Sequence, residues 1–231
     1  MAKGGGNGWR WLFAFALLAS MAAGGWWLWK NRYPIKGIDV SRYQGKIDWR
    51  KVKAAGYRFA FIKATEGTDY VDPYFAVNWD EAGDKGVVRG AYHFFRPGQD
   101  GKAQAEHFLK HLQVRKGDLP PVLDLEVTDD ATAAAIRREA LEWLQTVENA
   151  TGMKPIVYTL PHFADSYLDS KLARYPLWVV DLTLFRPSAS LGWPNWTFWQ
   201  HSHRGRVDGI AGDVDLNVFG GSEPEFRRLL K

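Results

Sequence analysis

Asp124 and Glu126 lie two positions apart at the end of a short apolar run that begins at Val122. In an extended strand the side chains at i and i+2 point to the same side, so the two carboxyl groups should lie together while Leu125 packs on the other side. Like charges beside a buried strand raise at least one pKa, which leaves one acid protonated and one ionised near neutral pH. Hydrolysis of glycosidic bonds needs such a pair. A pair of metal ligands and a solvated strand end are the alternative interpretations.

The elements that must position these acids follow from the pattern of the whole chain. Short apolar, β-rich runs occur at 37–40, 59–63, 87–94, 122–126, 156–159, 177–180, 197–200 and 214–218. Helical patterns lie at 75–85, 102–113 and 131–150, and a capping box at 222–225 begins a terminal helix. Asp130 is expected to cap the helix at 131–150, and Gly152 to end it. Strands that alternate with helices predict a parallel sheet. We therefore predict an α/β fold, an irregular (β/α) TIM-like barrel preceded by a single N-terminal transmembrane or signal helix. The irregular part follows Leu177, where good helical patterns are lacking.

Functional groups of a parallel β/α barrel gather where its strands end. The predicted strand ends carry these polar residues: Asp39, Lys63, Glu66, Tyr92, His93, Asp124, Glu126, Tyr158, Asp181, Gln200, Asp215 and Asn217. Nearby, Trp178, Trp196 and Trp199 are expected to offer apolar faces that suit sugar rings. The set predicts a polar cleft for a polyhydroxylated ligand, although contact with water explains a polar strand end at any single position.

A series of motifs extends in colinear order over about residues 35–220. It comprises Asp39-Val40-Ser41-Arg42-Tyr43-Gln44-Gly45, Gly56, Phe61-Ile62-Lys63-Ala64-Thr65-Glu66-Gly67, Tyr70, Asp72, Gly90-Ala91-Tyr92-His93-Phe94-Phe95, Leu123-Asp124-Leu125-Glu126, Pro155-Ile156-Val157-Tyr158, Trp199-Gln200 and Val214-Asp215-Leu216-Asn217. The series resembles the signature of glycoside hydrolase family 25, the lysozymes related to the Chalaropsis muramidase and to phage endolysins.

The resemblance implies hydrolysis of the β-1,4 bond between N-acetylmuramic acid and N-acetylglucosamine in peptidoglycan, without a metal or an organic cofactor. It implies Glu126 as the general acid/base. Asp124 would stabilise charge at the anomeric carbon, directly or by orienting the acetamido group of the substrate. Asp39 and Asp215 match the other active-site acids of the family. The residues expected to bind the substrate are Tyr92, Tyr158, Trp178, Gln200 and Glu66.

Two questions stay open at this point. Residues at i and i+2 of one strand have Cα atoms roughly 6.5 Å apart. This spacing does not decide whether the reaction is retaining or inverting. A catalytically silent peptidoglycan-binding module that keeps the same cleft is the alternative to an enzyme.

The first 33 residues differ in composition from the rest. Five of the 12 tryptophans fall there, and residues 11–29 contain no charge and one polar side chain, Ser20. An apolar run of this length spans a bilayer core as a helix, and flanking tryptophans are typical of membrane interfaces. We predict a signal anchor at 1–33, with a transmembrane helix at about 11–29, and a family 25 catalytic domain at 34–231. The alternative is a signal peptide cleaved near Ser20-Met21-Ala22.

Charge limits the partners of the domain. Residues 1–33 contain four basic and no acidic residues, which equals the net charge of +4 of the whole chain, so residues 34–231 sum to zero. A domain without net charge has no field to attract nucleic acid. We expect the partners to be peptidoglycan glycan strands and, through the N-terminal helix, the membrane, and we expect a monomer. The substrate implies a single-pass protein of the cell membrane with its catalytic domain on the periplasmic or extracytoplasmic side, or a secreted protein if the signal is cleaved.

Two histidine pairs could be taken for metal sites. His107 and His111 are four residues apart on a predicted helix, and His201 and His203 flank one residue. Neither pair lies in a His-Glu-x-x-His motif. We predict that they bind no metal.

Overall fold

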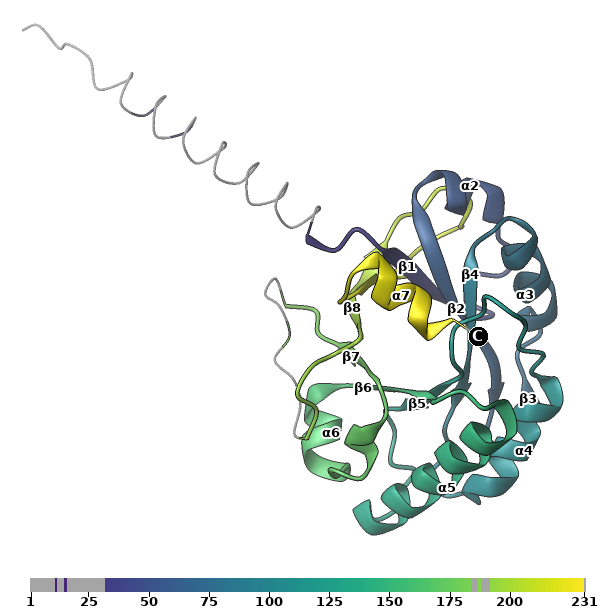
Figure 1. Cartoon of the computed structure of the whole chain (residues 1–231), viewed down its shortest axis with the longest axis vertical. Coiled ribbons are helices and arrows are strands. Elements are labelled where there is room, and N and C mark those ends of the chain that lie inside the picture. Colours follow the sequence, from purple (N-terminus) through teal and green to yellow (C-terminus); the bar gives the residue numbers. More distant parts are fainter. Residues whose placement is uncertain (1–10, 12–14, 16–31, 184–186, 188–191, 231) are drawn as a thin grey trace, which may run out of the picture. The chain divides into compact units, whose positions relative to one another are not determined.

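The computed structural model of the chain describes residues 11, 15, 32–183, 187 and 192–230. Its strands form one sheet in the order β1-β9-β8-β7-β6-β5-β4-β2-β3, and an additional pairing of β1 with β2 closes eight of them into a barrel (Figure 1). The strands are β1 (Lys36–Val40), β2 (Tyr57–Glu66), β3 (Tyr70–Val71), β4 (Val88–Phe94), β5 (Val122–Leu125), β6 (Ile156–Thr159), β7 (Leu177–Val180), β8 (Phe198–Gly205) and β9 (Val214–Phe219). The prediction of a closed α/β barrel is confirmed.

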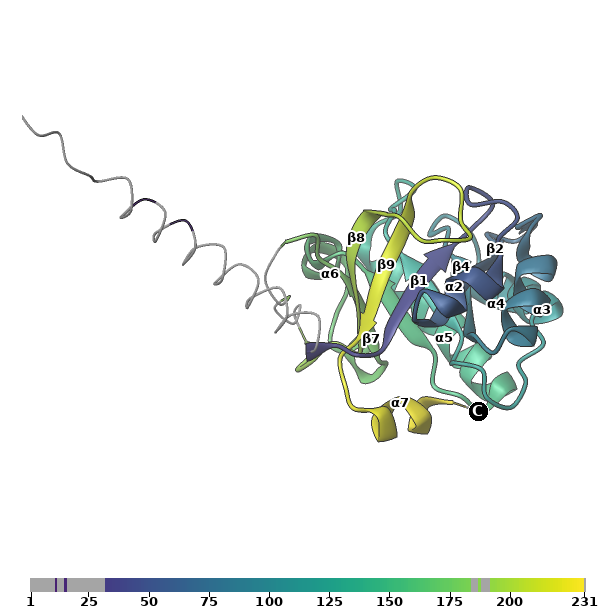
Figure 2. The same ribbon diagram turned by 90° about the horizontal axis from the view of Figure 1, so that it is seen from above.

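The orientation of β9 corrects the prediction of a parallel sheet. β9 runs antiparallel to both of its neighbours, β8 and β1, whereas β1, β2 and β4–β8 run parallel around the ring. Parallel strands need a crossover of a dozen or more residues, but only the loop 206–213 joins β8 to β9, so the two strands form a hairpin. In Figure 2, β1, β9 and β8 lie side by side. The reversal places the first residues of β9 at the rim where the other strands end.

Helices cover the outer side and one end of the barrel. They are α2 (Trp49–Ala54), α3 (Phe75–Asp84), α4 (Gly101–His111), α5 (Ala133–Thr151), α6 (Pro161–Tyr167), α7 (Glu223–Leu229) and a 3-10 turn, η1 (Leu172–Arg174). Helix α5 begins after Thr132, whose hydroxyl accepts from the N–H of Ala135, and not after Asp130 as we expected. Asp130 has a φ of 60° and lies in the preceding turn. Gly152 ends α5 with a φ of 68°, in agreement with its predicted role.

The capping box predicts the start of α7 correctly. The Glu225 carboxylate accepts hydrogen bonds from the backbone N–H of Ser222, at 2.7 Å, and from its hydroxyl, at 2.6 Å. Figure 2 shows α7 at the end of the barrel where β1 begins. There Phe226 joins the core, so this helix closes the end of the barrel opposite the rim.

Aromatic rings fill the interior of the barrel. Phe61 stacks on Trp178 with ring centroids 4.3 Å apart, and both contact neighbouring rings of the same cluster. Glycines make room for them: a Cβ on Gly37 would lie 2.3 Å from Phe59, and one on Gly90 would lie 2.7 Å from Phe61. This packing leaves no interior channel at that level. The polar residues of the interior are therefore concentrated at the rim.

The predicted transmembrane helix at about 11–29 lies outside the described residues, apart from Trp11 and Phe15. In the part of the chain that the structure describes, no helix is long and apolar enough to cross a membrane. Residues Ile35–Lys231 form a compact unit of their own.

Candidate active site

Two carboxyl groups face each other where β9 closes the barrel against β1. The antiparallel register pairs Asp39 directly with Asp215. Asp39 is buried, at 7% exposure, and Asp215 is partly buried. Residues directly opposite each other on neighbouring strands have Cβ atoms about 5 Å apart, so like charges there repel unless a proton is shared.

Buried amides hold Asp39 in place. Its Oδ2 accepts hydrogen bonds from Gln200 Nε2 at 2.9 Å and from Asn217 Nδ2 at 2.7 Å. Tyr158 donates its hydroxyl to Gln200 Oε1 at 3.0 Å, and Trp178 donates Nε1 to Asn217 Oδ1 at 2.8 Å. Side chains from five strands thus form one hydrogen-bonded chain across the barrel, which fixes both amides with their N–H groups toward the acid.

The pKa values of this pair are raised. Burial raises the pKa of Asp39 well above its ordinary value of 3.8, and the charge of Asp215 raises it further, against the hydrogen bonds from Asn217 and Gln200. Burial also raises the pKa of Asp215, although a hydrogen bond with Asp39 acts in the opposite direction. The directions fit a pair in which Asp39 holds the proton and Asp215 accepts it.

The motif residues Asp124 and Glu126 are brought to the same rim. Asp124 is buried at 6% exposure in β5, and its Oδ1 has no hydrogen-bond partner in the structure. Burial and the charge of Glu126 raise the pKa of Asp124 well above its ordinary value. Glu126 follows β5 and is partly buried, and burial raises its pKa as well. The charge of Glu126 thus disfavours the ionised form of Asp124, and the charge of Asp215 disfavours that of Glu126.

Two tyrosines lie within the field of the acids. Burial raises the pKa of Tyr92 and of Tyr158 well above the ordinary value of 10.0, and the carboxylates of Asp39 and Asp124 raise both further. Their hydroxyl groups therefore stay protonated at any physiological pH. The Tyr92 hydroxyl is therefore available as a hydrogen-bond donor, whereas the Tyr158 hydroxyl already donates to Gln200.

A network of ion pairs continues the rim beyond the acids. Lys63 Nζ lies 2.7 Å from Glu66 Oε2, and Arg96 pairs with Glu66 Oε1 through two of its nitrogens, at 2.5 and 2.9 Å. Arg96 also reaches Asp129, at 3.1 Å, in the loop that follows Glu126. These partners hold the pKa of Glu66 below its ordinary value against the effect of burial. Glu66, a predicted substrate-binding residue, is thus engaged by two cations in this structure.

The tryptophans do not lie as expected. Trp178 is 2% exposed, Trp199 is 2% exposed and Trp196 is 7% exposed, so none offers an open face to a sugar ring. Trp178 instead packs edge-on against Tyr158, with centroids 4.5 Å apart, beneath the polar rim. A large aromatic residue at the end of a strand can serve the core as well as the cleft, and the sequence pattern does not distinguish the two.

Three functional groups were missing from the predicted site or carried no role there. Asn217 holds Asp39 directly, Lys63 lies within the field of the acids, and Arg96 connects the ends of three strands. Asn217 lies in the motif Val214-Asp215-Leu216-Asn217, and Lys63 in the motif that begins at Phe61. Only their positions on the barrel reveal which group each contacts.

His93 lies on the helix side of β4 and not in the cleft. Its ring contacts Thr65 Oγ1 at 2.8 Å and Gln104 Oε1 at 3.1 Å, and burial lowers its pKa to about 3. His107 donates to the carbonyl oxygen of Tyr70 at 3.0 Å. No group of His, Cys, Asp and Glu side chains in the described residues is arranged to hold a metal ion.

The arrangement supports acid–base chemistry. Four carboxyl groups with raised pKa values line one rim, and on the eight-stranded ring β5 lies across from β9. A protonated acid on one wall can donate to a leaving group while ionised acids stabilise positive charge that develops between the walls.

Comparison with known proteins identifies what the chain is similar to. The model of the family "Glycosyl hydrolases family 25" matches residues 38–210. The chain is 39% identical over 201 residues to lysozyme M1 of Streptomyces globisporus, with 81% of this chain and 68% of that protein covered. It is 32% identical to the N,O-diacetylmuramidase of Chalaropsis sp over 212 residues, which cover 84% of this chain and 98% of the relative. The crystal structure of the bacterial lysozyme from Streptomyces coelicolor matches with a TM-score of 0.82 and 37% identity, over 85% of this chain and 96% of that one.

Asp124→Asn should change how stability depends on pH. A carboxyl group whose pKa is raised on folding stabilises the folded state below its unfolded pKa, and this contribution is lost as pH rises toward the folded pKa. Asparagine does not titrate. The free energy of unfolding of the variant minus that of the wild type should therefore increase from pH 4 to pH 8, by about 1 kcal/mol or more.

Chemical denaturation at a series of pH values measures this difference. Asp80→Asn is the control, because Asp80 is exposed and lies on α3. If the difference in free energy of unfolding between Asp124→Asn and the wild type stays constant with pH, folding does not raise the pKa of Asp124.

Proposed function

The chain belongs to the glycosyl hydrolases family 25, and from that premise we propose that Glu126 is the proton donor in cleavage of the β-1,4 bond between N-acetylmuramic acid and N-acetylglucosamine. The chain is a muramidase, a hydrolase of cell-wall peptidoglycan, because it belongs to this family and is similar to lysozymes and to a muramidase. The assignment of its catalytic residues rests on the geometry of the rim.

The observation that carries the assignment is that burial raises the pKa of both acids at the end of β5. Glu126 is partly buried and its pKa is raised, which suits a group that must hold a proton near neutral pH. It would protonate the glycosidic oxygen as the bond from that oxygen to the anomeric carbon breaks. The same residue, then ionised, would remove a proton from the water that completes hydrolysis.

Asp124 is suited to assist this step. Its Oδ1 is buried without a hydrogen-bond partner, and a buried acceptor of this kind has free energy to gain from a donor supplied by a ligand. The N–H of the substrate's acetamido group is such a donor. Alternatively, the ionised carboxylate would stabilise positive charge at the anomeric carbon directly.

Asp39 and Asp215 form the opposite wall in this proposal. The hydrogen bonds from Gln200 and Asn217 fix Asp39, so its position changes little as charge develops. Asp215 is the more exposed of the two, and as the acceptor of the proton that Asp39 holds it would carry the negative charge of the pair, although burial raises its pKa. Together they would favour the positive charge of the transition state over the neutral substrate.

Of the residues expected to bind the substrate, three have polar groups placed to contact it in this proposal. Tyr92 and Tyr158 keep their hydroxyl protons, and Gln200 spans Tyr158 and Asp39. We assign these three to hydrogen bonding with sugar hydroxyl and acetamido groups. Trp178 supports Tyr158 from below, and Glu66 acts through Lys63 and Arg96.

Glu126→Gln should abolish hydrolysis of purified peptidoglycan while the fold stays intact. Glutamine keeps the shape of the side chain but cannot donate the proton, and the loss of a general acid costs about 10²–10⁴-fold in rate. The measurement is the release of new reducing ends, with identification of the sugar at each new end. Circular dichroism and the melting temperature report the fold.

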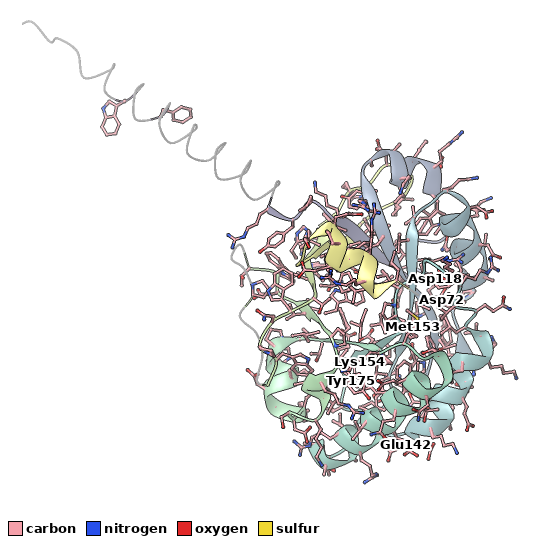
Figure 3. The ribbon with its side chains drawn as sticks, viewed as in Figure 1. Asp72, Asp118, Glu142, Met153, Lys154 and Tyr175 are labelled. Atoms are coloured by element: carbon pink, nitrogen blue, oxygen red, sulfur yellow. The ribbon has the colours of Figure 1, made fainter. Side chains whose placement is uncertain are left out.

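Glu142→Gln is the matched control. Glu142 is exposed on α5, where Figure 3 labels it, and it should retain full activity. Cleavage by Glu126→Gln at near the wild-type rate would refute the assignment. A catalytically silent binding module would instead show binding to cell walls without any release of reducing ends by the wild type.

Lys63→Met should move the pH–rate profile to higher pH. The Lys63 ammonium lowers the pKa of Glu126 and of Asp124, against the effect of burial. Without it both acids hold their protons to higher pH, so the alkaline limb, which reports the loss of the protonated donor, should shift upward. Methionine keeps the apolar length of the side chain, and Arg96 still pairs with Glu66.

The pH dependence of kcat/KM for the variant and the wild type tests this effect. Lys85→Met serves as control, since Lys85 is exposed at the end of α3. An unchanged profile, or one moved to lower pH, would show that the charge of Lys63 does not lower the pKa of the proton donor.

We propose further that residues 11–29 anchor the catalytic domain to the membrane, with the domain facing the cell wall. The uncharged apolar run and its flanking tryptophans support this proposal. The substrate supports the orientation, because peptidoglycan lies outside the cytoplasmic membrane.

Expression of the full chain in a bacterial host tests the anchor. The protein should sediment with membranes, resist extraction by alkaline carbonate, and lose its catalytic domain to external protease in spheroplasts. Soluble protein whose N-terminus lies after Ala22 would instead establish a cleaved signal peptide. A catalytic domain protected from protease in intact spheroplasts would reverse the orientation.

A further inference from the structure

Arg42, Tyr43 and Tyr70 form a cluster at the surface, which we name the Arg42 platform. The guanidinium donates from Nη1 to the Tyr70 hydroxyl at 3.1 Å and from Nη2 to the Tyr43 hydroxyl at 3.4 Å. Its central carbon lies 5.1 Å from the ring centroid of Tyr43 and 5.6 Å from that of Tyr70. The cation is thus held between two aromatic side chains from separate parts of the chain.

The platform adjoins the rim of the cleft. Arg42 lies in the loop that follows β1, three residues after Asp39, and Tyr70 lies in β3, the strand that pairs with the end of β2. Lys63 connects the two areas, because its Nζ lies 5.6 Å from the Tyr70 ring centroid and 2.7 Å from Glu66. A substituent of a ligand bound at the four acids would therefore have the platform beside it.

Buried hydrogen bonds hold the backbone beneath the platform. Asp72 is 3% exposed, and Figure 3 labels it. Its Oδ2 accepts from the backbone N–H of Arg42 at 2.9 Å, and its Oδ1 accepts from that of Tyr74 at 2.9 Å. Gln44 Oε1 accepts from the N–H of Ser41 at 3.0 Å. The side chains are presented from a fixed backbone, which lowers the entropic cost of binding a ligand.

The charge of Arg42 is not neutralised. Its interactions in the structure are with the two tyrosines, and no carboxylate of the described residues forms an ion pair with it. The guanidinium has five N–H donors, and the two hydrogen bonds leave others open to solvent. Tyr43 is 79% exposed, which is unusual for an aromatic side chain in a fixed loop. An exposed planar cation backed by aromatic rings is suited to a carboxylate ligand.

We propose that the Arg42 platform binds a carboxylate of the peptide stem that the muramoyl residue of peptidoglycan carries. This inference rests on the proposed function, which brings the glycan into the cleft. The stem leaves the sugar through its lactyl group and carries free carboxylates. A neutral sugar has no charge to pair with Arg42, so an acidic substituent fits this surface better than a further sugar unit.

The test compares three preparations of peptidoglycan. The first is intact, and the second has its stem carboxyl groups amidated with carbodiimide and ammonia. The third has lost its stems to an N-acetylmuramoyl-L-alanine amidase, and the lactyl carboxylates that this cleavage exposes are then amidated in the same way. At limiting substrate the wild type should cleave the intact material faster than the amidated material, by about three- to tenfold. Arg42→Glu should abolish this preference by slowing cleavage of the intact material alone.

Controls separate a role in recognition from damage to the fold. Arg50→Gln removes an exposed charge on α2 and should keep the wild-type preference. Arg42→Gln, which keeps a hydrogen-bonding group without charge, should lose the preference as Arg42→Glu does. Melting temperatures of both Arg42 variants should match that of the wild type, and both should cleave the stem-free glycan within about twofold of the wild-type rate.

Other outcomes would overturn the inference. An equal loss of rate by Arg42→Glu on all three substrates would mean that the platform acts on the sugars or on the fold. A preference that survives both substitutions would exclude the platform from stem recognition. If the wild type releases no reducing ends from the intact or the stem-free material, the proposed function itself fails, which distinguishes that failure from an error about the platform.

Discussion

The antiparallel pairing of β9 with β1 is the constraint on which the site depends. It closes the barrel, and its register sets Asp39 directly opposite Asp215. It also brings Asn217, on the same strand, within 2.7 Å of the Asp39 carboxylate. A parallel β9 would begin at the other end of the barrel and would carry its acid toward α7. The hairpin between β8 and β9 therefore decides where two of the four acids lie.

The buried carboxyl groups of the site cost the folded state free energy. Burial opposes ionisation of all four carboxyl groups, and Asp124 keeps an oxygen without a partner. The aromatic core below offsets this cost, since its rings pack at close contact from strand to strand. Trp178 belongs to both parts, because its ring packs on Phe61 while its Nε1 holds Asn217. Core packing and the position of the Asp39 carboxyl group are thus coupled through one side chain.

The fold was largely predictable, because each element carries its own local pattern. The capping box that begins at Ser222 correctly predicts the start of α7, and Gly152 correctly predicts the end of α5. The start of α5 was misplaced, since Asp130 and Thr132 are both acceptable caps, and only the backbone of the turn selects Thr132. The direction of β9 was also missed. The residues of β9 are typical of a strand whether it runs parallel or antiparallel to its neighbours. Only the short loop before β9 indicates a hairpin.

The sequence by itself predicted the acid pair at Asp124 and Glu126, because alternation along a single strand is a local property of the backbone. The motifs also determined the family, as the match over residues 38–210 bears out. Only the tertiary structure decided which groups meet across the barrel. The pairing of Asp39 with Asp215, the amides that hold Asp39, and the burial of Trp178 join residues far apart in the chain. Contacts of this kind depend on register and closure of the sheet, which no local pattern encodes.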